Sequence, residues 1–174
     1  MIQLREANFD DIEAEWLLVR DMPENENSYV NPYHCIGRQA FDKALYEMIE
    51  WSCGIGIPEG YVPDTTLFIW NGSELIGQAR IRHRLTEALR QGSGHIGFWI
   101  APQFRGRGYG TEALRQILDR AEGMVPEEEL YLRVDKDNTA SLRIIIKNGG
   151  RIEAEDGKTY FLRVGRRLPK ITEE

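Results

Sequence analysis

The chain has 174 residues and a formal net charge of −6, a length that fits a single domain with its own hydrophobic core. A net acidic chain lacks the broad positive surface of a nucleic-acid-binding protein, and no stretch approaches the roughly 18 apolar residues of a membrane span. The first residues also lack the apolar run of a signal peptide, so we expect a cytoplasmic protein.

The two cysteines, Cys35 and Cys53, do not form a C-x-x-C pair. Because the chain has only three histidines as well, this composition argues against a zinc site, and we predict no bound metal. Both cysteines are expected to be free thiols in a reducing compartment.

The first part of the chain predicts one strand and two helices. Residues 2–6 alternate as in a short strand, and Asn8 is a candidate N-cap for a helix that Pro23 ends. The apolar face of this helix carries Phe9, Ile12, Trp16 and Val19. Residues 24–37 are interpreted as a loop with aromatic side chains. A second helix then places four apolar residues on one side: Phe41, Leu45, Met48 and Ile49.

The middle of the chain predicts three strands. Asn71-Gly72 separates the strand-like runs 65–70 and 74–82, and this dipeptide between two such runs is a strong hairpin signal. A polar connection over 84–91 leads to a strand over 95–101, which Pro102 ends.

The last part predicts two helices and three strands. The first helix has apolar residues in helical register at Ala113, Leu114, Ile117, Leu118 and Ala121. A strand over 130–134 and a helix starting at Asn138 or Thr139 follow, and this helix is expected to turn Leu142, Ile145 and Ile146 inward. Asp156-Gly157 joins two final strands, 151–155 and 159–164.

The order of these elements is β-α-α-β-β-β-α-β-α-β-β. It predicts an α/β (α+β) fold with a mixed, mostly antiparallel sheet of about seven strands and four helices. No internal repeat or linker divides the chain, so we expect one domain over 1–168 and a C-terminal tail over 169–174.

A glycine-rich turn lies between the strand at 95–101 and the following helix. Its sequence is Arg105-Gly-Arg-Gly-Tyr-Gly110. Glycines let the main chain approach a ligand, and the first N–H groups of a helix favour an anion such as phosphate. The turn lacks the lysine of a P-loop, and its glycine spacing and antiparallel context differ from a dinucleotide-binding fingerprint.

The turn matches the pattern [Q/R]-x-x-G-x-[G/A], and the chain therefore resembles the GNAT acetyltransferase superfamily. The element order agrees with the GNAT fold along nearly the whole chain. Residues 138–141 (Asn-Thr-Ala-Ser) and 147–150 (Lys-Asn-Gly-Gly) are similar to the family's second cofactor-contacting segment.

The resemblance implies acetyl-CoA as cosubstrate, bound where the fourth and fifth strands splay apart. The pantetheine arm would pair with the free edge of the fourth strand at Trp99, Ile100 and Ala101, much as an added strand does. The pyrophosphate would be held by residues 105–111: Arg105, Gly106, Arg107, Gly108, Tyr109, Gly110 and Thr111. Asn138 would bond the pantetheine from the opposite side, with Ser141 facing the same cleft.

The resemblance also implies catalytic candidates. His95 falls where some family members carry a glutamate that serves as base, and histidine titrates in a suitable range; Asp135 and Glu87 are alternatives. Many members have a tyrosine as general acid on the last helix, where this chain has Ile144-Ile145-Ile146. Ser141 could donate the proton instead, or the thiolate could leave unassisted. The carbonyl would be polarised by a backbone amide near Ile100.

The acceptor is predicted to be the primary amine of a small or amino-acid-like molecule, with the N-terminus of a peptide as the alternative. Candidate contacts are Tyr29, Tyr33, Arg82 and His83. A basic rim formed with Arg80 and Arg84 could bind a carboxylate or phosphate, or be a solvated hairpin end. Trp51 and Trp70 could belong to the pocket or to the core. Two other functions stay open: a CoA-binding regulator without catalysis, and a binding domain without cofactor. Homodimers are common among such relatives, but no segment demonstrates an interface.

Overall fold

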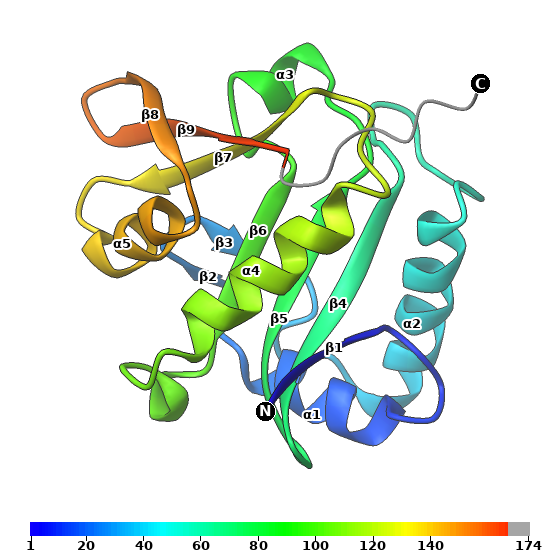
Figure 1. Cartoon of the computed structure of the whole chain (residues 1–174). Helices are drawn as coiled ribbons and strands as arrows, with labels where there is room; N and C mark the ends of the chain where they lie inside the picture. Colours follow the sequence, from blue (N-terminus) through cyan, green and yellow to red (C-terminus); the bar gives the residue numbers. More distant parts are fainter. Residues whose placement is uncertain (167–174) are drawn as a thin grey trace, which may run out of the picture.

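A computed structural model of the chain describes residues 1–166. The predicted tail, 169–174, and the end of the predicted domain, 1–168, lie outside the described residues. Figure 1 shows the elements of the described part, which are β1 (Ile2–Glu6), α1 (Ile12–Asp21), β2 (Asn25–Glu26), β3 (Tyr29–Val30), α2 (Arg38–Ser52), β4 (Asp64–Asn71), β5 (Glu74–Arg82), α3 (Glu87–Arg90), β6 (Ile96–Ile100), the 3-10 turn η1 (Pro102–Phe104), α4 (Tyr109–Ala121), β7 (Glu129–Asp135), α5 (Thr139–Lys147), β8 (Arg151–Glu155) and β9 (Thr159–Gly165).

Two antiparallel sheets carry the fold. The first has the strand order β1-β4-β5-β6 and the second has the order β7-β9-β8. Both predicted hairpins are present. Gly72, with φ of +63°, turns the chain between β4 and β5, and the Asp156 carboxylate accepts from the N–H groups of Lys158 and Thr159 between β8 and β9.

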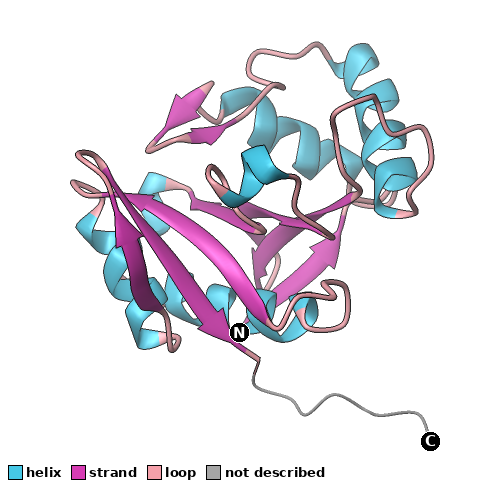
Figure 2. Cartoon of the chain, turned by 90° about the horizontal axis from the view of Figure 1, so that it is seen from above, coloured by secondary structure: helices cyan, strands magenta, loops and turns pink. Residues whose placement is uncertain are grey.

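The two sheets meet at one end of β6 and β7 and then separate (Figure 2). Within residues 1–166, the one main-chain hydrogen bond between these strands runs from the His95 N–H to the Tyr131 carbonyl, at 2.7 Å. β6 and β7 are the fourth and fifth strands of the sequence prediction, so the predicted splay between them is confirmed.

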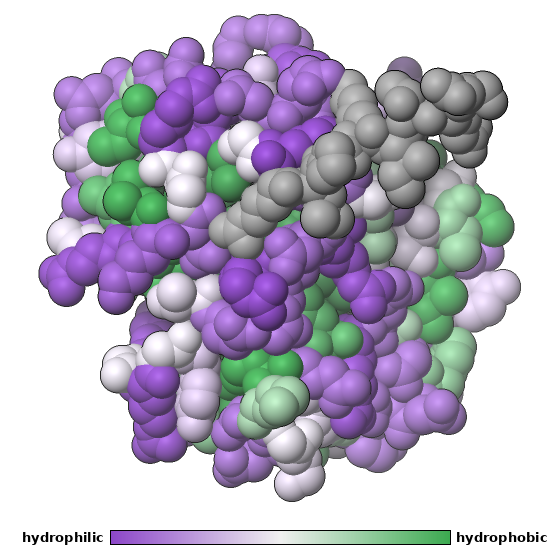
Figure 3. Space-filling model, viewed as in Figure 1, coloured by the Kyte–Doolittle hydropathy of each residue, from purple (hydrophilic) through white to green (hydrophobic). Residues whose placement is uncertain are grey.

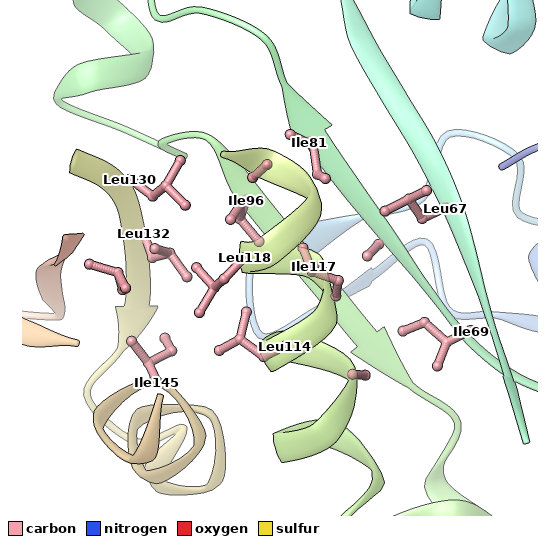
Figure 4. Packing of buried hydrophobic residues seen from close by; sticks show 14 of the residues in the cluster. Leu67, Ile69, Ile81, Ile96, Leu114, Ile117, Leu118, Leu130, Leu132 and Ile145 are labelled. Carbon is pink, nitrogen blue, oxygen red and sulfur yellow. The ribbon is translucent and has the colours of Figure 1, made fainter. Parts of the chain in front are cut away.

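Helix α4 packs across the split and holds the two sheets together. Leu114, Ile117 and Leu118 are buried on the helix face that the sequence predicted. They share one cluster with Ile96 of β6 and Leu132 of β7 (Figure 4). Burial of one such side chain contributes about 1.5–3 kcal/mol, so this cluster can keep the sheets joined where their ladder is broken.

Helices α1 and α2 cover the other face of the first sheet. A second buried cluster, with Val19 of α1, Phe41 and Leu45 of α2, and Phe68 of β4, fills this interface. The face drawn in Figure 3 is mostly hydrophilic, with hydrophobic residues in small separate groups. None of the helices in residues 1–166 has the length and apolar character needed to cross a bilayer.

The structure corrects four details of the sequence prediction. The predicted loop 24–37 contains the small hairpin β2–β3, and the predicted connection 84–91 contains α3. Phe9 is 52% exposed because the helix begins later, and the Asn8 side chain instead accepts from the Asp11 N–H (2.9 Å) in the preceding turn. Ile146 is 46% exposed, because it lies about 100° around α5 from the buried Ile145.

Candidate active site

A cleft of about 880 Å³ opens where β6 and β7 separate. One wall is β6 with the glycine-rich turn, and the opposite wall is the end of β7 with the start of α5. The β2–β3 hairpin, α2 and β5 line the remaining part. The split therefore opens a space between β6 and β7, which main-chain hydrogen bonds would join in a continuous sheet.

The glycine-rich turn presents free main-chain donors to this cleft. Gly106 and Gly108 have φ of +76° and +82°, a region that only glycine adopts readily. Among residues 1–166, nothing accepts from the N–H groups of Gly106, Arg107 or Gly108. Tyr109 and Gly110 begin α4, so their N–H groups have no intrahelical acceptor. Successive free N–H groups at a helix N-terminus form a site for a phosphate group.

The third glycine of the turn has a different role. A Cβ added at Gly110 would lie 2.9 Å from Ile144 Cδ1, whereas a Cβ at Gly106 or Gly108 would meet no atom within 4 Å. Gly110 therefore lets α4 approach α5, while the other two glycines set the main-chain direction.

The edge of β6 that faces the cleft is unpaired along its end. The Ala101 N–H donates to the Ile76 carbonyl at the start of the β5 ladder (2.8 Å). Since successive residues of an antiparallel strand point their main-chain groups to opposite edges, Ile100 and Phe98 direct theirs to the cleft. The Ile100 carbonyl accepts from Arg105 Nε at 2.7 Å. An extended ligand with amide groups fits this edge as an added strand would.

The start of α5 forms the opposite wall. Asn138 Oδ1 accepts from the Ser141 N–H (3.1 Å) and so caps the helix. Asn138 and Ser141 both line the cleft, and Ile144 lies one turn beyond them. Asn138 and Ser141 are two of the polar residues that this wall offers to a ligand; Arg143 and Lys147 of α5 also line the cleft.

The β2–β3 hairpin, which the sequence did not predict, connects the two walls of the cleft. The Glu26 carboxylate accepts from both terminal nitrogens of Arg105 (2.8 and 2.7 Å) and from Trp99 Nε1 (2.5 Å). Arg105 holds the pKa of Glu26 below its usual value despite partial burial. On the other side, the Ser28 hydroxyl donates to Asp135 Oδ2 (2.6 Å). Asn27 and Ser28 both have positive φ, and no local sequence signal for a hairpin such as Asn-Gly marks the turn.

His95 is not among the described residues that line the cleft. Its side chain is fully buried at the closed end of the split. Nδ1 accepts from the Tyr131 N–H (2.9 Å), and Nε2 lies 3.4 Å from Glu127 Oε2. Burial lowers the pKa of His95, although the nearby Glu127 carboxylate acts in the opposite direction. The structure therefore places His95 as a link between β6 and β7.

The two alternative candidates for the base differ in position. Asp135 lines the cleft, and its oxygens accept from Ser28 and from Arg133 (3.1 Å). Glu87 lies on α3, where it accepts from the Gln91 side chain (2.7 Å), and it is not among the described lining residues.

Most of the predicted cofactor residues line the cleft, and two do not. The lining includes Trp99, Ile100, Arg105, Gly106, Gly108, Tyr109, Gly110, Thr111, Asn138 and Ser141. Ala101 packs beside Met22 and Trp99, away from the lining, and the exposed Arg107 side chain also lies outside it.

The predicted acceptor residues divide in the same way. Tyr29, Tyr33 and Arg82 line the cleft, together with Arg80, Trp51 and two residues that the sequence reasoning missed, Glu47 and Tyr61. His83 lies outside the lining, with Nε2 2.8 Å from Thr65 Oγ1. Trp70 is buried in the cluster between α1, α2 and the sheet.

Comparisons with known proteins agree with this geometry. Residues 2–151 match the family described as Acetyltransferase (GNAT) domain, and a search of curated protein sequences finds no match. The fold is similar to Mycobacterium smegmatis RimJ in complex with CoA-disulfide (TM-score 0.69, 22% identity, 94% of this chain and 81% of that chain).

Two further solved structures have similar folds. One is the Campylobacter jejuni N-acetyltransferase PseH in complex with acetyl coenzyme A (TM-score 0.58, 15% identity, 95% of this chain and 99% of that chain). The other is the Vibrio cholerae spermidine N-acetyltransferase in complex with CoA and spermine (TM-score 0.62, 14% identity, 95% of both chains). The family match extends over most of the sequence and confirms the resemblance and the predicted enzyme class: the chain belongs to the GNAT acetyltransferases.

Proposed function

We propose that the protein transfers an acetyl group from acetyl-CoA to the primary amine of a small or amino-acid-like molecule. The observation that carries this proposal is the run of free N–H groups over 106–110 beside the unpaired edge of β6. The free N–H groups suit a diphosphate, and the unpaired edge of β6 suits the amides of a pantetheine arm.

The cofactor would be held mainly by main-chain groups. Residues 106–110 would bind the pyrophosphate, with Arg105 at the rim. The free edge of β6 at Phe98 and Ile100 would bind the pantetheine, and Asn138 would contact it from α5. The three similar solved structures contain acetyl-CoA, CoA-disulfide or CoA, which supports the same cosubstrate here.

When bound, acetyl-CoA supplies a thioester whose carbonyl carbon an amine nitrogen can attack directly in a ternary complex. A main-chain N–H of β6, at Phe98 or Ile100, would stabilise charge on the carbonyl oxygen. The C–N bond forms, the C–S bond breaks, the amine loses one proton, and the departing sulfur gains one.

The proton steps need groups inside the cleft. Because His95 lies outside it and Asp135 is engaged by Ser28 and Arg133, we propose water as the first acceptor of the amine proton. Ser141 is the proposed donor to the sulfur, since its hydroxyl lies on the lining of α5. A thiol has an ordinary pKa of about 8.5, so departure with weak assistance is chemically accessible.

Two measurements test this proposal. Acetyl-CoA at 100 times its Kd should stabilise the protein by about 2.7 kcal/mol in thermal unfolding, and thiol release should then occur with amines from a broad acceptor panel. The absence of any thermal shift at saturating acetyl-CoA would contradict the proposal.

A regulator that binds CoA without catalysis is the second candidate. It is favoured by Ile144, which lies on the cleft in the region where many relatives have a tyrosine acid. This function predicts a thermal shift with acetyl-CoA but no thiol release across the panel. Thiol release therefore separates the two functions; where it occurs, replacing Ser141 with alanine should lower turnover by about tenfold or more if Ser141 is the proton donor.

A further inference from the structure

The acceptor end of the cleft contains an arginine whose charge has no partner. Arg82 NH1 donates to the Gly94 carbonyl at 3.2 Å. A guanidinium carries five N–H donors, and within residues 1–166 no carboxylate lies within 4.0 Å of this one. Burial, followed by the proximity of Arg80, lowers the pKa of Arg82 from its usual value, although the Asp64 carboxylate acts in the opposite direction at longer range.

The neighbouring charges do not neutralise Arg82. Arg80 Nε lies 3.4 Å from Asp64 Oδ2, so the one buried carboxylate at this end already has a cation. Glu47 also lines the cleft, but its carboxylate is paired with Lys43 at 3.5 Å on the surface of α2. Among residues 1–166, Arg82 therefore has no ion pair of its own, and partly buried charges are costly unless paired.

The strand register sets how far this charge lies from the proposed reaction centre. Arg80 and Arg82 lie two residues apart on β5, so both face the same side of the sheet. Arg80 is directly opposite Gly97 of β6, and a Cβ at Gly97 would lie 3.2 Å from the Tyr29 ring. Phe98, one of the two residues proposed to polarise the carbonyl, is opposite Ala79, three residues from Arg82. Three residues span about 10 Å along a strand, which is the scale of a small molecule with an anion at one end and an amine at the other.

We infer that the acceptor carries an oxyanion, a carboxylate or phosphate, that binds Arg82 while its amine points toward β6. This inference rests on the proposed function. Arginine binds both oxyanions through paired N–H groups, and Tyr29 lies beside the same space with its hydroxyl donating to Gln78 Oε1 (3.0 Å).

The test compares matched acceptors in the presence of acetyl-CoA. Amino acids are compared with their carboxamides, and aminoalkyl phosphates with the corresponding amino alcohols, by kcat/KM. In the unchanged protein, the anionic member of one series should be preferred by about tenfold or more. A preference in the amino-acid series identifies a carboxylate, and a preference in the aminoalkyl phosphate series identifies a phosphate.

Variants then locate the subsite. Arg82→Gln should reduce that preference ratio by about tenfold or more, while Arg82→Lys should keep part of it. Arg84→Gln is the matched control, because Arg84 follows on the same chain segment but is exposed and is not among the described lining residues; its ratio should stay unchanged. The thermal unfolding midpoint of each variant is measured alongside.

The outcomes separate this inference from the proposed function. Equal or lower kcat/KM for the anionic acceptors in the unchanged protein overturns the inference, and this result needs no variant. An unchanged ratio in folded Arg82→Gln overturns the assignment to Arg82. No stabilisation by acetyl-CoA would instead contradict the proposed function.

Discussion

The two ends of the cleft are built from different parts of the polypeptide. At the proposed cofactor end, the available donors are the main-chain N–H groups of five consecutive residues, 106–110. At the acceptor end, the polar groups are side chains from separate elements, such as Tyr29 of β3 and Arg82 of β5. A main-chain site depends on glycine conformation and tolerates side-chain change, whereas a side-chain site changes with each substitution. The cofactor end can therefore keep its ligand when substitutions change the side chains, and with them the ligand, of the acceptor end.

The largest effect is expected from the cofactor end. In the double variant Gly106→Ala, Gly108→Ala, each added Cβ occupies a left-handed conformation that costs roughly 1–2 kcal/mol. Relaxation would rotate the N–H groups away from the phosphate, so the Kd for acetyl-CoA, measured by calorimetry, should rise about 100-fold.

Gly149→Ala is the matched control for this variant. Gly149 has φ of +87°, and an added Cβ there would also meet no atom within 4 Å, but the residue is not among the described lining residues. Gly149→Ala should lower the free energy of unfolding by a similar amount per substituted glycine and leave the Kd for acetyl-CoA unchanged. The same Kd for acetyl-CoA in the unchanged protein, the double variant and Gly149→Ala would contradict a cofactor site built from the main chain of this turn.

A smaller effect is expected where the two ends are connected. Arg105→Gln removes the contacts of Arg105 with Glu26 and with the Ile100 carbonyl. This should raise the KM for both acetyl-CoA and the acceptor by about three- to tenfold, because the hairpin that carries Tyr29 loses its anchor; partly exposed ion pairs contribute on the order of 1 kcal/mol.

Glu26→Gln sharpens this prediction. It disturbs the hairpin while leaving the turn intact, so steady-state kinetics should show a raised KM for the acceptor with little change for acetyl-CoA. A rise confined to acetyl-CoA would show that the hairpin does not serve the acceptor end.

The closed end of the split should affect stability more than chemistry. His95→Leu leaves the Tyr131 N–H without its acceptor, which should lower the free energy of unfolding by about 1–3 kcal/mol. His95→Asn offers an oxygen near the position of Nδ1 and should lose less. The pH profile of kcat/KM should be unchanged in both folded variants. Loss of the acidic limb of that profile would return the base role to His95.

The smallest effect on the cleft is expected from Glu15, whose fully buried side chain lies on α1. Desolvation raises the pKa of Glu15 to about 8, despite a hydrogen bond from the Asn8 N–H. The folded state then binds a proton more tightly than the unfolded state, so the contribution to stability is full below about pH 4.5 and declines as the pH rises to about 8.

Glu15→Gln should remove this decline, as measured by denaturant unfolding across the pH range, and leave the Kd for acetyl-CoA unchanged. A pH dependence of stability that is the same in both proteins would contradict the assignment of that decline to Glu15.

The sequence predicts the fold well wherever a local pattern determines the structure. The strand at 2–6, the two hairpin turns and the apolar stripe of α4 all follow from short-range periodicity or turn chemistry. The β2–β3 hairpin escapes prediction because its strands have two residues each, too few to show alternation. Its geometry depends on Glu26 and Ser28 reaching partners far along the chain.

The same contrast applies to the site. The turn over 105–110 could be identified from a six-residue motif, because its chemistry lies in consecutive main-chain groups. His95 was expected to act in the cleft because it falls where some relatives carry a glutamate base, but position along the strand does not show where a neighbouring strand such as β7 closes over it. Tyr61 and Glu47 were missed because only the packing of α2 and its following loop brings them to β5.

The most direct test of the cofactor site is an amide NMR titration with CoA and, separately, with pantetheine, which lacks the diphosphate. CoA is expected to shift the N–H resonances of Gly106, Gly108 and Gly110 strongly, while pantetheine at saturation leaves them close to their free positions. Saturation with CoA that leaves these three resonances unmoved would contradict a diphosphate site in this turn.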